Sequence, residues 1–174
     1  MSLPHPSLPQ SRLPQSSLPR SSVLRLADED ITTDRSTRQA RLKWVIVVDE
    51  SLPAGRITNA AACMAAAVGK ALPGLLGPDG ADASGVTHPG LPWAGCTVLA
   101  ADGGTLRALR AKAATKDEVL IVDMPEPAQT SRVYDEYLRV LAGTGQDDLG
   151  YCAVSLVGPR NRIDRLVGGL SLLR

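Results

Sequence analysis

Four short apolar runs alternate with four helix-forming stretches between residues 43 and 167, and this alternation constrains the fold more than any other feature. The runs at residues 43–48, 96–100, 119–122 and 151–157 are rich in β-branched and aliphatic residues, as buried strands are. The stretches that follow them, at residues 57–68, 104–114, 130–141 and 160–167, favour helix. This order predicts a three-layer α/β/α sandwich with a four-stranded, mixed or mainly parallel sheet.

The core of this domain has to be built from small aliphatic side chains. The 174-residue chain is 44% hydrophobic, but it contains no phenylalanine and its aromatic content is only 3%. Such a core packs mainly through Ala, Val, Leu and Gly, which lets helices lie close to a sheet. Length and composition therefore indicate one domain at residues 43–174, preceded by a tail.

A five-residue repeat lies in that tail. Leucine followed by proline recurs at Leu3, Leu8, Leu13 and Leu18. Because proline fixes φ and removes an amide donor, residues 1–22 are expected to be a disordered, polyproline-like arm without helix or strand. The arm is either a docking ligand or a dispensable extension. Residues 23–42 are expected to be a linker with some local helix.

The charge distribution argues against a domain that grips nucleic acid. From Trp44 onward the chain has 12 basic and 14 acidic residues, whereas residues 1–43 have seven basic and four acidic ones. Proteins that bind phosphate backbones carry a basic surplus on the binding face. The basic residues between Arg107 and Lys116 and between Arg160 and Arg165 form either local patches or a solvated face.

Cysteine, histidine and apolar content exclude further classes of protein. Cys63, Cys96 and Cys152 are odd in number and far apart, which indicates reduced thiols rather than a disulfide framework. With His5 and His88 as the only imidazoles and no paired ligand motif, no metal site and no cofactor are expected. Since neither a membrane span nor a secretory signal is recognisable, we expect a cytoplasmic protein without a membrane partner.

Three stretches resemble a bacterial family of unknown function, DUF2000, which is itself similar in fold to peptidyl-tRNA hydrolase II. They are residues 52–62, with the run Asn59-Ala60-Ala61-Ala62, the loop at residues 82–90, and the ending formed by residues 157–159 and 169–173. The resemblance covers the whole predicted domain. It implies a peptidyl-tRNA hydrolase II-like fold and marks Asn59, Asp82 and His88 as site residues.

The hydrolase motif itself is carried over only in part. Where that family begins a helix with Gly-Lys-x-Ala-Ala-Gln followed by a histidine, this chain has Gly55, Arg56, Ala60 and Cys63. The hydrolase aspartate at the end of the third strand corresponds to Asp123. Arg56 keeps the positive charge for an anionic group, but it stays protonated and cannot exchange protons as a lysine can.

Polar residues are expected to converge where the strands end. Asp123 follows the third apolar run, and ligands of α/β sheets bind outside the carboxyl ends of strands. Arg56 and Asn59 lie in the first turn after the first run, where free amides favour an anion or an oxyanion. If the long loop that carries His88 folds over this crevice, the imidazole serves as general acid or base, oriented by Asp82 or Asp123.

Two hypotheses follow for the function. The first is a hydrolase or acyl transferase acting on an acyl ester or amide, with aminoacyl- or peptidyl-tRNA as one option for the substrate. Its catalytic residues are Asp123, His88 and Asn59, and its binding residues are Arg56, Asp82, Lys43 and Cys63. The second is a non-catalytic module that binds a small anion or a protein, with a homodimer as one option. The structural alternatives are helix capping for Asn59, turn formation for Asp123 and His88, and core packing for Cys63.

Overall fold

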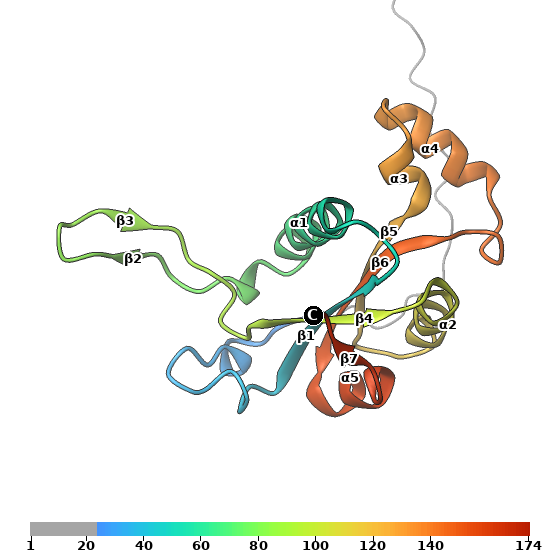
Figure 1. Cartoon of the computed structure of the whole chain (residues 1–174). Coiled ribbons are helices and arrows are strands. Elements are labelled where there is room, and N and C mark those ends of the chain that lie inside the picture. The colour runs from blue at the N-terminus through green and yellow to red at the C-terminus, as the bar shows by residue number, and fades with distance from the viewer. Residues whose placement is uncertain (1–23) are drawn as a thin grey trace, which may run out of the picture.

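A five-stranded mixed sheet forms the centre of the computed structural model, which describes residues 24–174 (Figure 1). Its strands are β1 (Leu42–Asp49), β4 (Cys96–Ala101), β5 (Leu120–Pro125), β6 (Tyr151–Pro159) and β7 (Ser171–Leu172), in the order β5-β6-β1-β4-β7. β1 pairs parallel with β4, and β6 runs antiparallel to both β1 and β5. The mixed sheet confirms the expectation. The sheet has five strands rather than four because β7 pairs with Leu99 and Ala100.

Helices cover both faces of this sheet and give the expected three layers. They are α1 (Ala54–Ala71), α2 (Gly103–Ala114), α3 (Glu126–Thr130), α4 (Tyr134–Gly143) and α5 (Arg160–Val167). Figure 1 shows α1 on one face and α2 with α5 on the other, while α3 and α4 lie beside β5. The helix expected at 130–141 is α4, which begins four residues later at Tyr134, and the short helix α3 before it was not expected; Ser131 and Val133, between the two helices, have extended backbones.

Alternating side chains of β1 supply both cores. Val45 and Val47 pack with α2 and α5, whereas Ile46 and Val48 pack with α1. Burying each of these side chains contributes about 1.5–3 kcal/mol. Trp44 joins the α1-side core, where its indole nitrogen donates a hydrogen bond of 2.9 Å to the Ser155 hydroxyl. Apolar side chains thus cover both faces of the sheet.

The long connection between α1 and β4 carries a hairpin. The 3-10 helix η2 (Pro73–Leu75) is followed by β2 (Gly80–Ala81) and β3 (Thr87–His88), which pair with each other. A Cβ at Gly90 would lie 1.8 Å from the carbonyl oxygen of Gly77, so the base of the hairpin requires glycine. Figure 1 shows the hairpin extending away from the sheet. The long loop therefore does not fold over the strand ends.

Residues 24–41, expected as a linker, pack on the domain. Leu24 and Leu26 lie against the α1-side core, and Ala40 is buried. The Arg160 guanidinium donates to the carbonyl oxygens of Thr37 at 2.7 Å and Ala40 at 2.9 Å. The local helix expected here is the single 3-10 turn η1 (Asp28–Asp30). The arm expected at residues 1–22 lies outside the described residues.

Between residues 24 and 174, no helix combines the length and the apolarity that crossing a membrane requires.

Candidate functional site

A small cavity lies at the carboxyl end of β1, and we call it the crevice. Its volume is about 240 Å³, and its lining residues are Asp49, Leu52, Arg56, Glu126, Thr130, Tyr151 and Cys152. They come from the end of β1, the start of α1, the helix α3 and the start of β6. Because β1, β4 and β5 run in the same direction, their carboxyl ends meet at this edge, where α/β sheets bind ligands.

Arg56 is the cationic residue of the crevice. Its Nε donates to the side-chain oxygen of Gln129 at 2.8 Å, and its Nη2 donates to the Cys152 sulfur at 3.7 Å. None of the ion pairs formed among residues 24–174 includes Arg56. A half-buried guanidinium whose side-chain hydrogen bonds go to neutral partners still has unused N–H donors.

Gln129 fixes α3 against the first two turns of α1. Besides accepting from Arg56, its amide nitrogen donates to the Arg56 carbonyl at 2.8 Å and to the Asn59 side-chain oxygen at 3.2 Å. The residue at the N-cap position of α1 is Pro53, and no side chain caps the helix there. Asn59 lies in the second turn and therefore does not cap the helix as the structural alternative expected. The Gln129 side chain therefore orients both the Arg56 guanidinium and the Asn59 amide, which were expected at the site.

A thiol, Cys152, and two carboxylates, Asp49 and Glu126, also line the crevice. Burial raises the pKa of the Cys152 thiol, and the opposing effect of the guanidinium is smaller. This thiol is therefore neutral at pH 7 and is not an activated nucleophile. Glu126 lies on α3, and Asp49 ends β1 while accepting from the Ser51 hydroxyl at 2.7 Å. The crevice thus combines one cation with two carboxylates.

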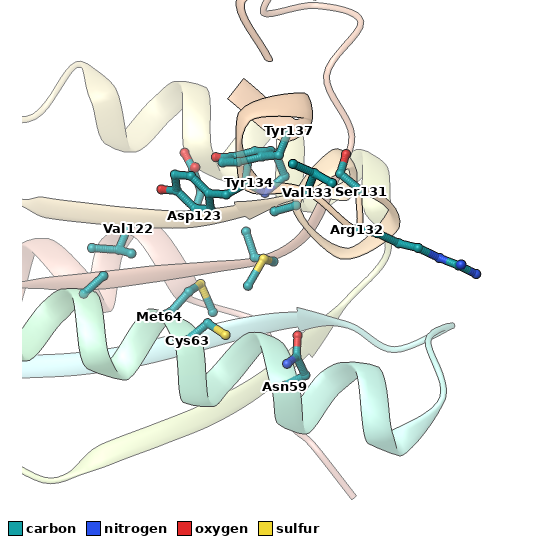
Figure 2. Close-up of a pocket in the computed structure, with 14 residues that line it drawn as sticks. Asn59, Cys63, Met64, Val122, Asp123, Ser131, Arg132, Val133, Tyr134 and Tyr137 are labelled. Atoms are coloured by element: carbon teal, nitrogen blue, oxygen red, sulfur yellow. The ribbon is translucent and has the colours of Figure 1, made fainter. Parts of the chain in front are cut away.

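A second hollow, which we call the side groove, lies between α1 and the α3–α4 pair (Figure 2). Its volume is about 500 Å³. Asn59 and Cys63 line it from α1, and Cys63 is exposed. Tyr134 and Tyr137 form the opposite wall in an edge-to-face pair with ring centroids 5.5 Å apart. The groove is mostly apolar, so it differs in character from the crevice.

Asp123 also borders the side groove, but an arginine holds its carboxylate. Its Oδ2 lies 3.0 Å from Nε of Arg110 on α2, and the aspartate side chain is 22% exposed. The strand β5 continues for two residues beyond Asp123, so this residue is not at the strand end as expected. Asp123 lines the side groove together with Asn59 and Cys63 of α1, but its carboxylate is paired with α2 on the other face of the sheet, and it is absent from the residues that line the crevice.

The remaining expected site residues lie elsewhere. His88 is in the extended hairpin, 63% exposed, with its Nε2 3.6 Å from a carboxylate oxygen of Asp82 (Figure 1). Lys43 is at the start of β1, where its Nζ pairs with Asp164 of α5 at 2.5 Å. The structure therefore brings Arg56, Asn59, Cys63 and Asp123 to one side of the molecule and separates His88, Asp82 and Lys43 from them.

Four residues of this region were not expected from the sequence. Asp49 could have been found, because it directly follows the apolar run at residues 43–48, and this position after a strand is the signal by which Asp123 was selected. Glu126 and Gln129 lie in a short helix that has no sequence pattern, and Arg110 lies in a basic stretch that resembles a solvated face. Only their packing reveals them. Within residues 24–174, no group of three or more His, Cys, Asp or Glu side chains is placed to hold a metal ion.

Comparisons with known proteins give a family and a fold. The model of the family described as "Protein of unknown function (DUF2000)" matches residues 42–174. No curated protein matches the chain. A solved structure of a protein of unknown function, Atu0240 from Agrobacterium tumefaciens strain C58, is similar with a TM-score of 0.72. It is 16% identical, and the match covers 77% of this chain and 98% of that chain, so the likeness concerns the fold alone.

Proposed function

For this chain, which belongs to the DUF2000 family of proteins of unknown function, we propose from its own geometry that it is a non-catalytic module that binds a small polar molecule with an anionic group in the crevice. The observation that carries this proposal is Arg56, a half-buried guanidinium bound only to neutral partners. A carboxylate or phosphate is the partner that such a group binds most strongly, because its hydrogen bonds are charge-assisted.

The two carboxylates of the crevice restrict the ligand further. Glu126 and Asp49 would repel a ligand that carries only negative charge, and they would accept hydrogen bonds from an amine or hydroxyl group. The matching ligand therefore has an anionic group for Arg56 and a donor group for the carboxylates. Amino acids and their phosphorylated derivatives are of this class. A cavity of about 240 Å³ is smaller than typical drug-sized pockets, which also favours a small metabolite over a polymer.

The hydrolase hypothesis has weaker support in the geometry. Its general acid or base, His88, lies in the hairpin that extends away from the sheet, and Asp123 is ion-paired with Arg110. The Cys152 thiol, whose pKa is raised by burial, is not a substitute nucleophile. Acyl-ester hydrolysis, tRNA as a substrate, the likeness to peptidyl-tRNA hydrolase II and a homodimer stay predictions.

A thermal-shift screen tests the proposal. The wild-type protein is heated with each common amino acid, O-phosphoserine, inorganic phosphate and acetate at matched ionic strength. A ligand present at about 100 times its Kd stabilises the folded state by about 2.7 kcal/mol, which a melting curve resolves easily. We expect at least one zwitterion to raise Tm more than acetate does, and this increase to disappear in Arg56→Gln.

Two controls make the screen specific. Arg139→Gln removes an exposed arginine of α4 and should leave every ligand-induced shift unchanged. A hydrolysis assay with aminoacyl-tRNA and simple acyl esters should give no turnover with the wild type. Turnover that Asp123→Ala abolishes would favour the enzyme hypothesis, and equal shifts for wild type and Arg56→Gln would refute the crevice as the binding site.

A further inference from the structure

The side groove is an apolar surface that the described chain leaves uncovered. Tyr134 is 72% exposed and Val133 is 59% exposed at its rim, and none of the residues of α4 is buried. A wall of paired tyrosines next to aliphatic side chains is the chemistry with which proteins bind proline-rich segments: prolines stack on the rings, and hydroxyl groups donate to backbone carbonyls. The side groove therefore has the character of a site for an extended, proline-containing chain.

We propose that the Leu-Pro arm of the same chain, residues 1–22, docks in the side groove. The arm offers the matching chemistry: leucines for the apolar floor, proline rings for Tyr134 and Tyr137, and backbone carbonyls for the tyrosine hydroxyls and the Asn59 amide. Proline at every fifth position prevents the arm from adding to the free edge of β5 as a strand, since it cannot complete a ladder of hydrogen bonds.

The place where the arm joins the domain supports docking within one molecule. Leu24 and Leu26, the first apolar residues of the described chain, pack on the same face of the sheet as α1, which forms one wall of the groove. A polyproline-like chain rises about 3.1 Å per residue, so 22 residues reach about 70 Å. The whole of α1, with 18 residues at about 1.5 Å each, spans only about 27 Å. The arm is therefore long enough to reach the groove.

The repeat itself has a consequence for the strength of docking. The five-residue period does not match the three residues per turn of a polyproline helix, so successive Leu-Pro units do not face the same side. Each unit has to occupy the groove in turn, and the four units act as interchangeable ligands at a high effective concentration. Loss of one unit should weaken docking slightly, and loss of all four should abolish it.

The exposed thiol of Cys63, on the groove wall opposite the tyrosines, serves as the reporter. Full-length proteins are treated with iodoacetamide, the alkylation of Cys63 is followed by peptide mass spectrometry, and glutathione in the same tube calibrates the reagent. Replacing all four arm leucines by serine should speed the alkylation of Cys63 by about 3-fold or more, since a tethered ligand at millimolar effective concentration occupies most of a weak site. Leu3→Ser alone should have little effect.

Controls separate docking from other changes. Gln10→Ser with Gln15→Ser alters the arm but keeps every Leu-Pro unit, so the wild-type rate should persist. Tyr134→Ala should speed the alkylation of Cys63 in the protein with the wild-type arm. It should cause no further increase in the rate in the variant whose four arm leucines are serine. Equal rates in the wild type and the four-leucine variant would overturn the proposal. Protection that appears only as the protein concentration is raised would overturn docking within one molecule and indicate a second copy. Neither result depends on ligand binding in the crevice.

Discussion

Replacing Gln129 by alanine should loosen the whole candidate site, because this side chain is the link between α3 and the start of α1. It accepts one hydrogen bond from the Arg56 guanidinium at 2.8 Å and donates two, to the Arg56 carbonyl at 2.8 Å and to the Asn59 oxygen at 3.2 Å. Neutral bonds contribute about 0.5–1.5 kcal/mol each and a bond from a charged donor about 1.5–3 kcal/mol. Because the site is only half-buried, we expect a total loss of about 2 kcal/mol.

Urea unfolding followed by tryptophan fluorescence measures this loss, with Trp44 as a buried probe in the α1-side core. Thr130→Ala is the matched control on the neighbouring residue, since its hydroxyl bonds only to carbonyls of its own helix, and it should change stability by less than about 0.5 kcal/mol. The same Gln129→Ala protein should also bind crevice ligands more weakly. Stability equal to that of Thr130→Ala would refute the role assigned to Gln129.

Three further predictions concern the rest of the domain. Ser155→Ala should lower the free energy of unfolding by about 1–3 kcal/mol, because it leaves the Trp44 indole N–H buried without an acceptor. In urea unfolding, the double variant Ser155→Ala with Trp44→Phe should lose less stability than the sum of the losses in the two single variants. Desolvation raises the pKa of Cys96 to about 12 although part of its surface is exposed, so at pH 7.5 mass spectrometry should find it far less alkylated than a typical cysteine. Hydrogen bonds from the Thr105 hydroxyl and amide lower the pKa of Asp102, so the charged carboxylate stabilises the fold at pH values above the pKa of the unfolded chain. Asp102→Ala should therefore lower Tm at pH 7, and the difference in Tm between wild type and variant should shrink as the pH falls below about 4.

The layered fold was predictable because its signals are local. Runs such as residues 43–48 and 151–157 are short and rich in β-branched and aliphatic residues, which favours buried strands, and the helices between them follow from propensity and length. The fifth strand was not predictable, since β7 has only two residues and depends on the exposed edge of β4 for its partners. The helix α3 was not predictable either, because its five residues carry no helical sequence pattern.

The candidate site was only partly predictable from the sequence. Arg56 and Asn59 were found because a strand followed by a helix places its first turns at the ligand-binding edge of a sheet. His88 was expected near them, but the hairpin that carries it is a self-contained unit, closed by its own hydrogen bonds to Asp82, and nothing in its sequence fixes its direction. Gln129 could not have been found, because its partners lie 70 or more residues away in the chain.

Nuclear magnetic resonance of the arginine side chains tests the central claim most directly. In protein labelled with ¹⁵N, the Nε–H signal of Arg56 is assigned by its absence from Arg56→Lys, and the ligand with the largest thermal shift is titrated in. The account predicts a saturable shift of this signal at the same Kd as the Tm increase, with the signal of Arg139 unmoved. Saturable binding that leaves the Arg56 signal unchanged would contradict the proposed anion site.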